Sequence, residues 1–165
     1  MAISNLHDVY HDQLQDLYSA CKQSLDVTTE LAQAASNDDL KKALNAGAQG
    51  ISDGMEKIAQ LCNDHDIDPN GEHCKGMEGL VKEARAHGLD EDISDADARD
   101  AMIITQYQRM AHYAIAGYGC LRAFANRLDL DGDGAVLTDC LDASYEGDRT
   151  MTDIATGQVN RDAAA

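Results

Sequence analysis

The stretch QYQRMAHYAIAGYG, residues 106–119, carries a single histidine, His112, and three tyrosines among alanines and other helix-forming residues. It lies inside a longer segment, between Asp100 and Asp129, that contains no acidic residue. A helix of this kind presents little charge to water, and the pattern therefore favours burial against other helices. The stretch predicts a long helix and raises the question of what one histidine does in it.

Apolar residues recur at three- and four-residue spacing on both sides of this stretch, which is the pattern of amphipathic helices. In the first such segment the series begins with Leu6 and Val9 and continues to Leu25. The chain contains a single proline, Pro69, and this scarcity favours long helices over strands and turns. The predicted helices are 4–35, about 40–63, 74–87, about 95–128 and about 135–160.

Four long helices and one short helix predict an all-α protein built as an antiparallel four-helix bundle. The additional short helix falls in the connection between long helices two and three. Residues 1–165 show no repeat, no linker and no convincing strand alternation, so a single domain is expected. Its core is predicted to be aliphatic because aromatic residues make up only 4% of the chain.

Local signals mark where several of these helices begin and end. Ser4 is expected to cap the first helix. Gly88 is expected to end the short helix. Ser94 with Asp97 resembles a capping box at the start of the long helix that contains His112.

The chain is strongly acidic, with a net charge of −17. This charge argues against nucleic acid and anionic membranes as partners. The first residues, MAISNLHDVYHDQ, show no basic run followed by an apolar stretch, and so no secretory signal is recognised. No apolar run approaches the roughly 20 residues of a membrane span. We therefore expect a soluble cytoplasmic protein.

The five cysteines also bear on the compartment. An odd number of cysteines without a signal peptide predicts reduced thiols and not a disulfide framework. Cys21 and Cys120 fall within apolar helical patterns and are expected to be small core residues. The five residues are Cys21, Cys62, Cys74, Cys120 and Cys140.

Four motifs, in this order along the chain, carry a resemblance to a known family. They are LYSACKQSL (17–25), CKGMEGLVKEA (74–84), HYAIAGYG (112–119) and MTDIA (151–155). With them the chain resembles the YciE/YciF-type ferritin-like stress-protein family over nearly its whole length. The resemblance implies a bundle whose core holds two metal ions on inward-facing carboxylates and histidines.

The positions that the resemblance assigns to metal ligands carry other residues here. The first-helix glutamate falls at Cys21, the second-helix Glu-x-x-His at Gln49 and Ser52, the acids of the fourth helix at Ala111 and Ala114, and the acids of the last helix around Ala143 and Ser144. Loss of one ligand would leave an unbalanced buried charge that costs several kcal/mol. Loss of the whole set leaves a weakly polar core. We therefore expect a degenerate di-iron site and no bound cofactor.

Three glycines, Gly47, Gly50 and Gly54, lie on one face of the second predicted helix. Each costs about 1 kcal/mol relative to alanine in a helix interior. Close helix packing or a dimer contact at Gly50 is the favoured explanation. There are two alternatives. One is sequence drift after the metal ligands were lost, and the other is a ligand cavity.

The loop CNDHDIDPNGEHC, residues 62–74, offers a second candidate site. Two thiolates and two imidazoles suit tetrahedral zinc, but their spacing is not a standard zinc pattern. A reversible bridge between the two cysteines and an ordinary polar loop are the alternatives. The candidate zinc ligands are Cys62, His65, His73 and Cys74.

The segment DLDGDG, residues 129–134, resembles the start of a calcium loop. Asp129, Asp131 and Asp133 take its first, third and fifth positions, but Cys140 stands where a bidentate glutamate belongs. An acidic helix N-terminus, stabilised by the helix dipole, explains the same residues. Weak calcium binding stays open as the alternative.

His112 stands beside Tyr113, without a serine or cysteine nucleophile at a diagnostic position. It is expected to be a satisfied core or interface histidine. The sequence as a whole favours a non-catalytic ferritin-like homodimer, stress-associated by resemblance, whose protein partner is unknown. One alternative is a metal-binding protein or oxidoreductase with a site rebuilt around Cys21, His112 and Asp148. The other is an interaction module modulated by calcium or zinc.

Overall fold

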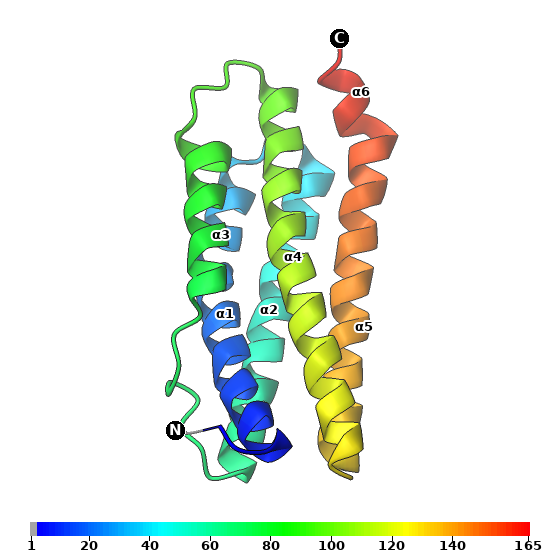
Figure 1. Ribbon diagram of the computed structural model, residues 1–165. Helices are drawn as coiled ribbons and strands as arrows, with labels where there is room; N and C mark the ends of the chain where they lie inside the picture. Colours follow the sequence, from blue (N-terminus) through cyan, green and yellow to red (C-terminus); the bar gives the residue numbers. More distant parts are fainter. Residues whose placement is uncertain (1–2) are drawn as a thin grey trace.

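The computed structural model describes residues 3–165, and the secondary-structure elements of these residues are all helices (Figure 1). The four long helices and the short one lie where the apolar spacing predicts them. Their observed bounds are α1 Leu6–Ala34, α2 Asp38–Asp64, α3 Lys75–Arg85, α4 Ala96–Arg127 and α5 Asp131–Ile154. Two π-helical turns, η1 Ala86–Asp90 and η2 Ala155–Val159, follow α3 and α5, and a last short turn, α6, covers Asn160–Asp162.

The long helices form two antiparallel pairs, α1 with α2 and α4 with α5. The pairs meet where α1 packs on α4 and α2 packs on α5. The short helix α3 runs back along the bundle in the connection from α2 to α4 and packs on both α1 and α4 (Figure 1). Because of this return, every pair of neighbouring long helices is antiparallel, as the all-α ferritin-like bundle requires.

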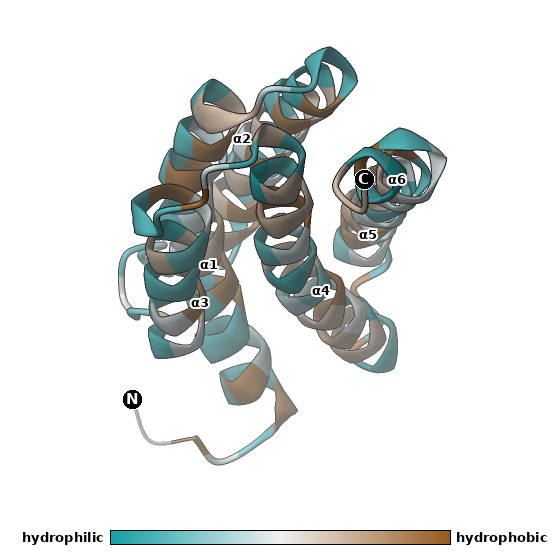
Figure 2. Ribbon diagram, turned by 90° about the horizontal axis from the view of Figure 1, so that it is seen from above, coloured by the Kyte–Doolittle hydropathy of each residue, from teal (hydrophilic) through white to brown (hydrophobic). Residues whose placement is uncertain are grey.

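The core lies along the axis of the bundle, where the hydrophobic faces of the helices meet (Figure 2). It is mainly aliphatic, as the composition predicts. Tyr10 is a fully buried aromatic exception near the start of α1. The largest aliphatic side chains of the core with less than 2% exposure are Leu14, Leu31, Leu40, Leu44, Ile58, Met77, Ile103, Leu121, Leu137 and Met151.

The helix caps differ from the predicted ones by a single residue in two places. Asn5, and not Ser4, caps α1, and its side chain accepts a hydrogen bond from the Asp8 amide. Asp95, and not Ser94, caps α4 through the Ala98 amide. Asn and Asp cap as well as Ser does, and so the sequence alone offered neighbouring candidates of equal strength.

Gly88 does not end the helical segment that begins with α3. The segment continues as the π-helical turn η1 to Asp90, and Gly88 is buried inside it with a negative φ. A Cβ at Gly88 would lie 2.8 Å from the Leu31 side chain on α1. The glycine therefore permits close packing of η1 on α1 instead of a left-handed helix end.

The turn between α1 and α2 is held by a side chain from α4. Asp100 is fully buried, and its two carboxylate oxygens accept hydrogen bonds from the amides of Ser36 and Asn37 at 2.8 and 2.7 Å. Carboxylate acceptors of this kind form strong, charge-assisted hydrogen bonds. Asp100 thus fixes the α1–α2 pair against α4. Among residues 3–165, no helix is both long and apolar enough to cross a bilayer.

Candidate functional site

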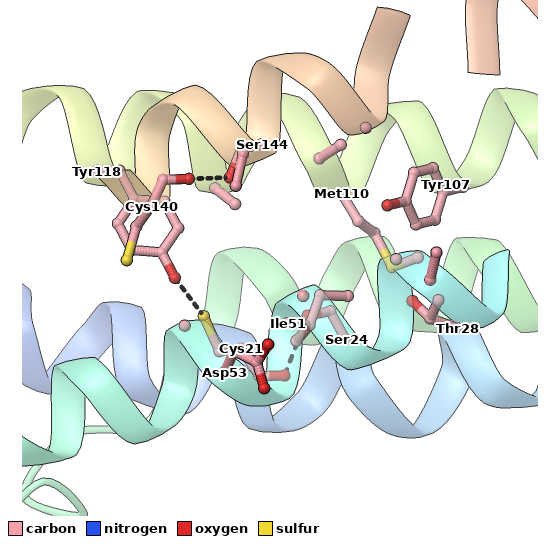
Figure 3. Close-up of a pocket in the computed structure, with 18 of the residues that line it drawn as sticks. Cys21, Ser24, Thr28, Ile51, Asp53, Tyr107, Met110, Tyr118, Cys140 and Ser144 are labelled. Atoms are coloured by element: carbon pink, nitrogen blue, oxygen red, sulfur yellow. Dashed lines mark hydrogen bonds between the residues drawn. The ribbon is translucent and has the colours of Figure 1, made fainter. Parts of the chain in front are cut away.

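A cavity of about 410 Å³ lies at the centre of the bundle, between α1, α2, α4 and α5 (Figure 3). Its volume is within the range of small-molecule sites in proteins, roughly 300–1,000 Å³. Most of its lining is contributed by small or apolar side chains. The lining residues are Ala20, Cys21, Ser24, Thr28, Ala43, Ala46, Gly47, Gly50, Ile51, Asp53, Gly54, Lys57, Met77, Tyr107, Met110, Ala111, Ala114, Tyr118, Cys140, Ala143, Ser144, Glu146, Gly147 and Thr150.

The cavity has a buried floor and an open mouth. The floor comes mainly from α1 and α4, whose lining side chains include Thr28 at 0% exposure and Tyr107 at 6%. The mouth lies along the seam between α2 and α5. The lining residues that are exposed to solvent all come from these two helices: Ala46, Gly50, Asp53, Lys57, Ala143, Glu146 and Thr150.

The glycines of α2 make room for tyrosines and do not bring helices together. A Cβ at Gly54 would lie 2.5 Å from the hydroxyl oxygen of Tyr118, and a Cβ at Gly47 would collide in the same way with Tyr107. A Cβ at Gly50 would meet no atom within 4 Å. Within the described chain, the predicted close helix contact at Gly50 is therefore wrong, and the glycine face lines a cavity.

One end of the cavity holds thiols and a phenol. The Cys21 sulfur and the Tyr118 hydroxyl share a hydrogen bond of 3.5 Å, and Cys140 lies beside them (Figure 3). Burial raises the pKa of Cys21 to about 11 and raises the pKa of Tyr118 well above its usual value. Both groups are therefore neutral at physiological pH, and Cys21 is a poor nucleophile.

The other end of the cavity holds the hydroxyls of Thr28 and Tyr107 (Figure 3). The Oγ1 atom of Thr28 is buried and makes no hydrogen bond among the described residues. The Tyr107 hydroxyl lines the cavity beside Gly47, and burial raises its pKa so that it stays protonated. A buried hydroxyl without a partner costs about 1–3 kcal/mol. This end can therefore stabilise a polar group of a bound molecule.

The comparison with protein families identifies the scaffold. The model of the family described as Domain of unknown function (DUF892) matches residues 5–164. The chain belongs to this family. It is also 32% identical to Protein YciF of Escherichia coli (strain K12) over 164 residues, covering 99% of this chain and 98% of that protein.

Solved structures agree with this membership. The crystal structure of the E. coli stress protein YciF superposes with a TM-score of 0.89 at 31% identity, covering 96% of this chain and 99% of that one. YcfI from Rhodopseudomonas palustris gives a TM-score of 0.85 at 28% identity, covering 91% of this chain and 94% of that one. The predicted fold and the resemblance to the YciF-type family are both confirmed.

The cavity coincides with most of the positions that the resemblance assigns to metal ligands. Cys21, Ala111, Ala114, Ala143 and Ser144 all contribute to its lining. These positions converge from three different helices, which supports that part of the alignment.

On α2 the assigned positions are displaced by one residue. Gln49 is exposed and donates a hydrogen bond of 2.8 Å to Asp53, and neither Gln49 nor Ser52 lines the cavity. Gly50 and Asp53 line it instead, at the same spacing of three residues. A shift of one residue turns a helical side chain by about 100°, which is enough to move it from the cavity to the surface of the bundle.

The donors that line the cavity do not fit the pair of metal ions that the family resemblance implies. Its only carboxylates are Asp53 and Glu146, both exposed at the mouth, and no histidine lines it. The thiols of Cys21 and Cys140 are protonated because burial raises their pKa. Within residues 3–165, no group of three or more His, Cys, Asp or Glu side chains is arranged to hold a metal ion.

The candidate zinc ligands are not gathered in one cluster. His65 lies 2.7 Å from the Asp133 carboxylate, and His73 pairs with Glu78 at 2.9 Å. Cys74 caps α3, and its sulfur lies 3.0 Å from the Tyr113 hydroxyl. Cys62 and Cys74 are both buried free thiols, so the predicted alternative of a bridge between them is not formed in this structure.

The candidate calcium residues form a helix start. Asp131 and Asp133 lie in the first turn of α5, where carboxylates are stabilised by the helix dipole. Asp133 also accepts a hydrogen bond of 2.7 Å from the Tyr10 hydroxyl. Asp129 precedes the helix with a φ of 57°. The helix therefore begins at Asp131, about four residues before the predicted start.

The proposed rebuilt site of Cys21, His112 and Asp148 is not assembled. His112 does lie 3.1 Å from Asp148, but its side chain is 62% exposed and neither residue lines the cavity that contains Cys21. The expectation that His112 lies in the core is therefore wrong, and the alternative that it lies at an interface stays a prediction. Cys120, also predicted to be buried, is exposed. Both lie on a helix with so few charges that apolar spacing does not separate its inner and outer faces.

The sequence alone did not assign several residues to this site, among them Thr28, Tyr107, Met110, Tyr118 and Asp53. One signal was present: Cys21, Ser24 and Thr28 follow each other at three- and four-residue spacing, as the three glycines do on α2. Two such faces of small and weakly polar residues predict a poorly filled bundle centre.

Proposed function

We propose that this protein is a non-catalytic member of the YciF-type family, associated with stress physiology, whose di-iron centre has been lost and which acts as a homodimer. The observation that carries the proposal is the lining of the central cavity. Cys21, Ala111, Ala114 and Ser144 stand at positions that the resemblance assigns to ligands, and none of them is a carboxylate or a histidine.

Charge balance supports the same conclusion. Ferrous and ferric ions need several carboxylates to neutralise them in a low-dielectric core. The two carboxylates of the lining, Asp53 and Glu146, are exposed at the mouth, and Lys57 adds a positive charge beside them. A pair of iron ions at the floor would remain largely uncompensated, which costs several kcal/mol per charge.

The stress association rests on family membership, because the E. coli relative is described as a stress protein. The homodimer is proposed as an expectation from the sequence, and light scattering of the purified chain tests it. A monomeric mass at micromolar concentration contradicts this part of the proposal without affecting the rest.

Metal analysis of protein purified without a metal-affinity tag tests the main claim. We expect less than about 0.1 iron per chain, and no change in the melting temperature when ferrous iron is added anaerobically, because a ligand stabilises a fold only if it binds the folded state. About two irons per chain, or an iron-dependent rise in melting temperature, would overturn the proposal. One tightly held calcium or zinc would select the alternative of a metal-modulated interaction module.

A further inference from the structure

The size of the central cavity sets the scale of what it accepts. An engineered cavity of about 150 Å³ in another protein binds benzene. The cavity here, at about 410 Å³, has room for roughly two to three ring-sized groups on that comparison. It is too large to be a packing defect of one missing side chain.

The length of the cavity follows from the two tyrosines that define its ends. The Tyr107 hydroxyl lies against Gly47 and the Tyr118 hydroxyl lies against Gly54. Seven residues of helix span about 10 Å. Between these ends, Gly50 faces open space. The cavity is therefore an elongated slot and not a round hole.

The two ends differ chemically. At the Tyr118 end, the phenol already shares a hydrogen bond with the Cys21 sulfur. At the Tyr107 end, the Thr28 hydroxyl is fully buried and has no hydrogen-bond partner among residues 3–165, and the Tyr107 phenol lines the cavity beside Gly47. Two hydroxyls that can each donate a proton form a site for a hydrogen-bond acceptor such as a carbonyl oxygen.

The floor of the cavity carries no charge and therefore disfavours ionised ligands. No lining residue of α1 or α4 is charged at neutral pH, since the pKa values of Cys21, Tyr107 and Tyr118 are all raised by burial. At the mouth, Asp53 and Glu146 outnumber Lys57, which disfavours anions further. The lining thus selects uncharged molecules.

From these observations we propose that the centre of the bundle is a binding site for a small uncharged amphipathic molecule that enters between α2 and α5. Its apolar body lies in the slot beside Gly50, Ala111 and Ala114, and its acceptor group lies between the hydroxyls of Tyr107 and Thr28. This site goes beyond the loss of metal proposed above, because a core without iron could equally have closed up around larger side chains.

A fluorescence titration with N-phenyl-1-naphthylamine tests the binding of an uncharged apolar molecule. We expect saturable 1:1 binding with a blue-shifted emission. The anionic probe 1-anilinonaphthalene-8-sulfonate has the same ring skeleton with one added negative charge, and we expect it to bind about tenfold more weakly or less. Equal affinities for the two probes would contradict a site selective for uncharged molecules.

A substitution at Gly50 tests whether the probe binds in the slot. Gly50→Leu fills the open space without a clash and is expected to weaken probe binding by about tenfold or more. Gly79→Leu is the matched control, because Gly79 is exposed on α3, also has no atom within 4 Å of its Cβ, and does not line the cavity. Ala143→Leu, at the exposed mouth on α5, is a second blocking variant if Gly50→Leu does not fold. Binding that survives both blocking variants overturns the proposal.

Competition by two isosteric compounds tests the hydroxyl end. We expect 2-acetylnaphthalene to displace the probe at about threefold lower concentration than 2-isopropylnaphthalene, because only the former carries an acceptor. Tyr107→Phe and Thr28→Val are each expected to bring the displacing concentrations of the two compounds closer together, because each removes one hydroxyl donor. If the displacing concentrations of the two compounds differ as much in both variants as in the parent, the assigned position of the acceptor group is wrong. The metal analysis and these titrations measure different quantities, so failure of one proposal is distinguishable from failure of the other.

Discussion

The hydroxyl of Tyr107 on α4 lies directly against Gly47 on the facing helix α2. A Cβ at this position would also lie 3.0 and 3.1 Å from the Cζ and Cε2 atoms of the ring. The ring is 6% exposed and therefore has little freedom to move away. The contact with Tyr107 thus requires glycine at position 47. At Gly50, one turn further along the same face of α2, no neighbour among residues 3–165 makes such a contact.

This difference predicts opposite effects of the same substitution at two neighbouring glycines. Gly50→Ala should stabilise the fold by about 0.5–1 kcal/mol, because alanine loses less backbone entropy in a helix. Gly47→Ala should destabilise it by about 1–3 kcal/mol through overpacking. Gly54→Ala should fall between them, since only the hydroxyl of Tyr118 would come closer than 3.4 Å. Urea denaturation of the three variants measures the order.

The double variant Gly47→Ala/Tyr107→Phe serves as the control for the clash. Removal of the hydroxyl should recover part of the loss, so that the two substitutions are not additive. Additive effects, or a stabilising Gly47→Ala, would contradict the contact between Tyr107 and Gly47.

A second prediction concerns the carboxylate that holds the α1–α2 turn. Asp100→Ala should cost about 2–4 kcal/mol, because two hydrogen bonds to a charged acceptor are lost. Asp100→Asn keeps one acceptor oxygen and should cost about half as much. Asp92→Ala, at an exposed loop position, is the control and should have little effect. Denaturant midpoints at neutral pH provide the measurement, and equal midpoints for Asp100→Ala and Asp92→Ala would contradict the role of Asp100.

The sequence predicted the number, order and approximate ends of the helices because apolar spacing and a single proline leave little alternative to a bundle. The caps predicted at Ser4 and Ser94 failed because the neighbouring Asn5 and Asp95 have similar local preferences. The end predicted at Gly88 failed because Gly88 packs on Leu31 of another helix.

The candidate site was predictable only in part. The sequence shows that Cys21, Ala111 and Ala114 are neither carboxylates nor histidines at the positions that the resemblance assigns to ligands, and these positions do meet in the cavity. The Thr28 hydroxyl, which has no partner among residues 3–165, could not be predicted, because a missing hydrogen bond depends on the placement of every neighbouring atom. The sequence left open whether His112 lies in the core or at an interface, because helical spacing does not assign a face when charges are scarce.

A third prediction follows from the burial of the cysteines. Among the five thiols only Cys120 is exposed, and burial raises the pKa of Cys21 and Cys62 to about 11. Ellman's reagent should therefore modify one thiol per native chain rapidly and all five only after denaturation. Cys120→Ser should remove the rapid phase. Several rapid thiols in the native chain would indicate that the buried cysteines are accessible.

Acid stability gives a fourth prediction, centred on His11. Burial, followed by the nearby charges of His65 and His7, lowers the pKa of His11 from its usual 6.5 against a weaker opposite effect of Asp8. The unfolded state therefore binds the proton more readily, and the stability that neutral His11 provides is present above pH 6.5 and is lost as the pH falls below that value. His11→Gln should reduce the loss of unfolding free energy between about pH 7.5 and 5.5.

The surroundings of His11 determine how this experiment is interpreted. His65 and Asp133 form a pair beside it, and Tyr10 bonds to the same carboxylate. These groups remain in the variant, so the comparison is between the slopes of stability against pH and not between absolute stabilities. An identical slope in the parent and the variant would contradict the role of His11.

The last prediction tests the centre of the bundle by restoring its charges at the positions that the structure assigns. The variant carries Cys21→Glu, Gly50→Glu, Asp53→His, Ala111→Glu and Ala114→Glu, all at positions that line the cavity. Without metal it should be less stable than the parent, because carboxylates crowded in a low-dielectric core must repel each other or take up protons. Ferrous iron should restore about 2–3 kcal/mol at a concentration 100-fold above its dissociation constant.

The matched control moves the α2 ligands back by one residue, to Gln49→Glu and Ser52→His, and keeps the other three substitutions. Since neither position lines the cavity, the control should recover much less stability from iron than the first variant does, and the parent should recover none. Thermal melts with and without anaerobic ferrous iron compare the three proteins. An equal response of the two variants would show that the face of α2 assigned to the cavity is wrong. A response of the parent would reveal a metal site that its lining does not explain.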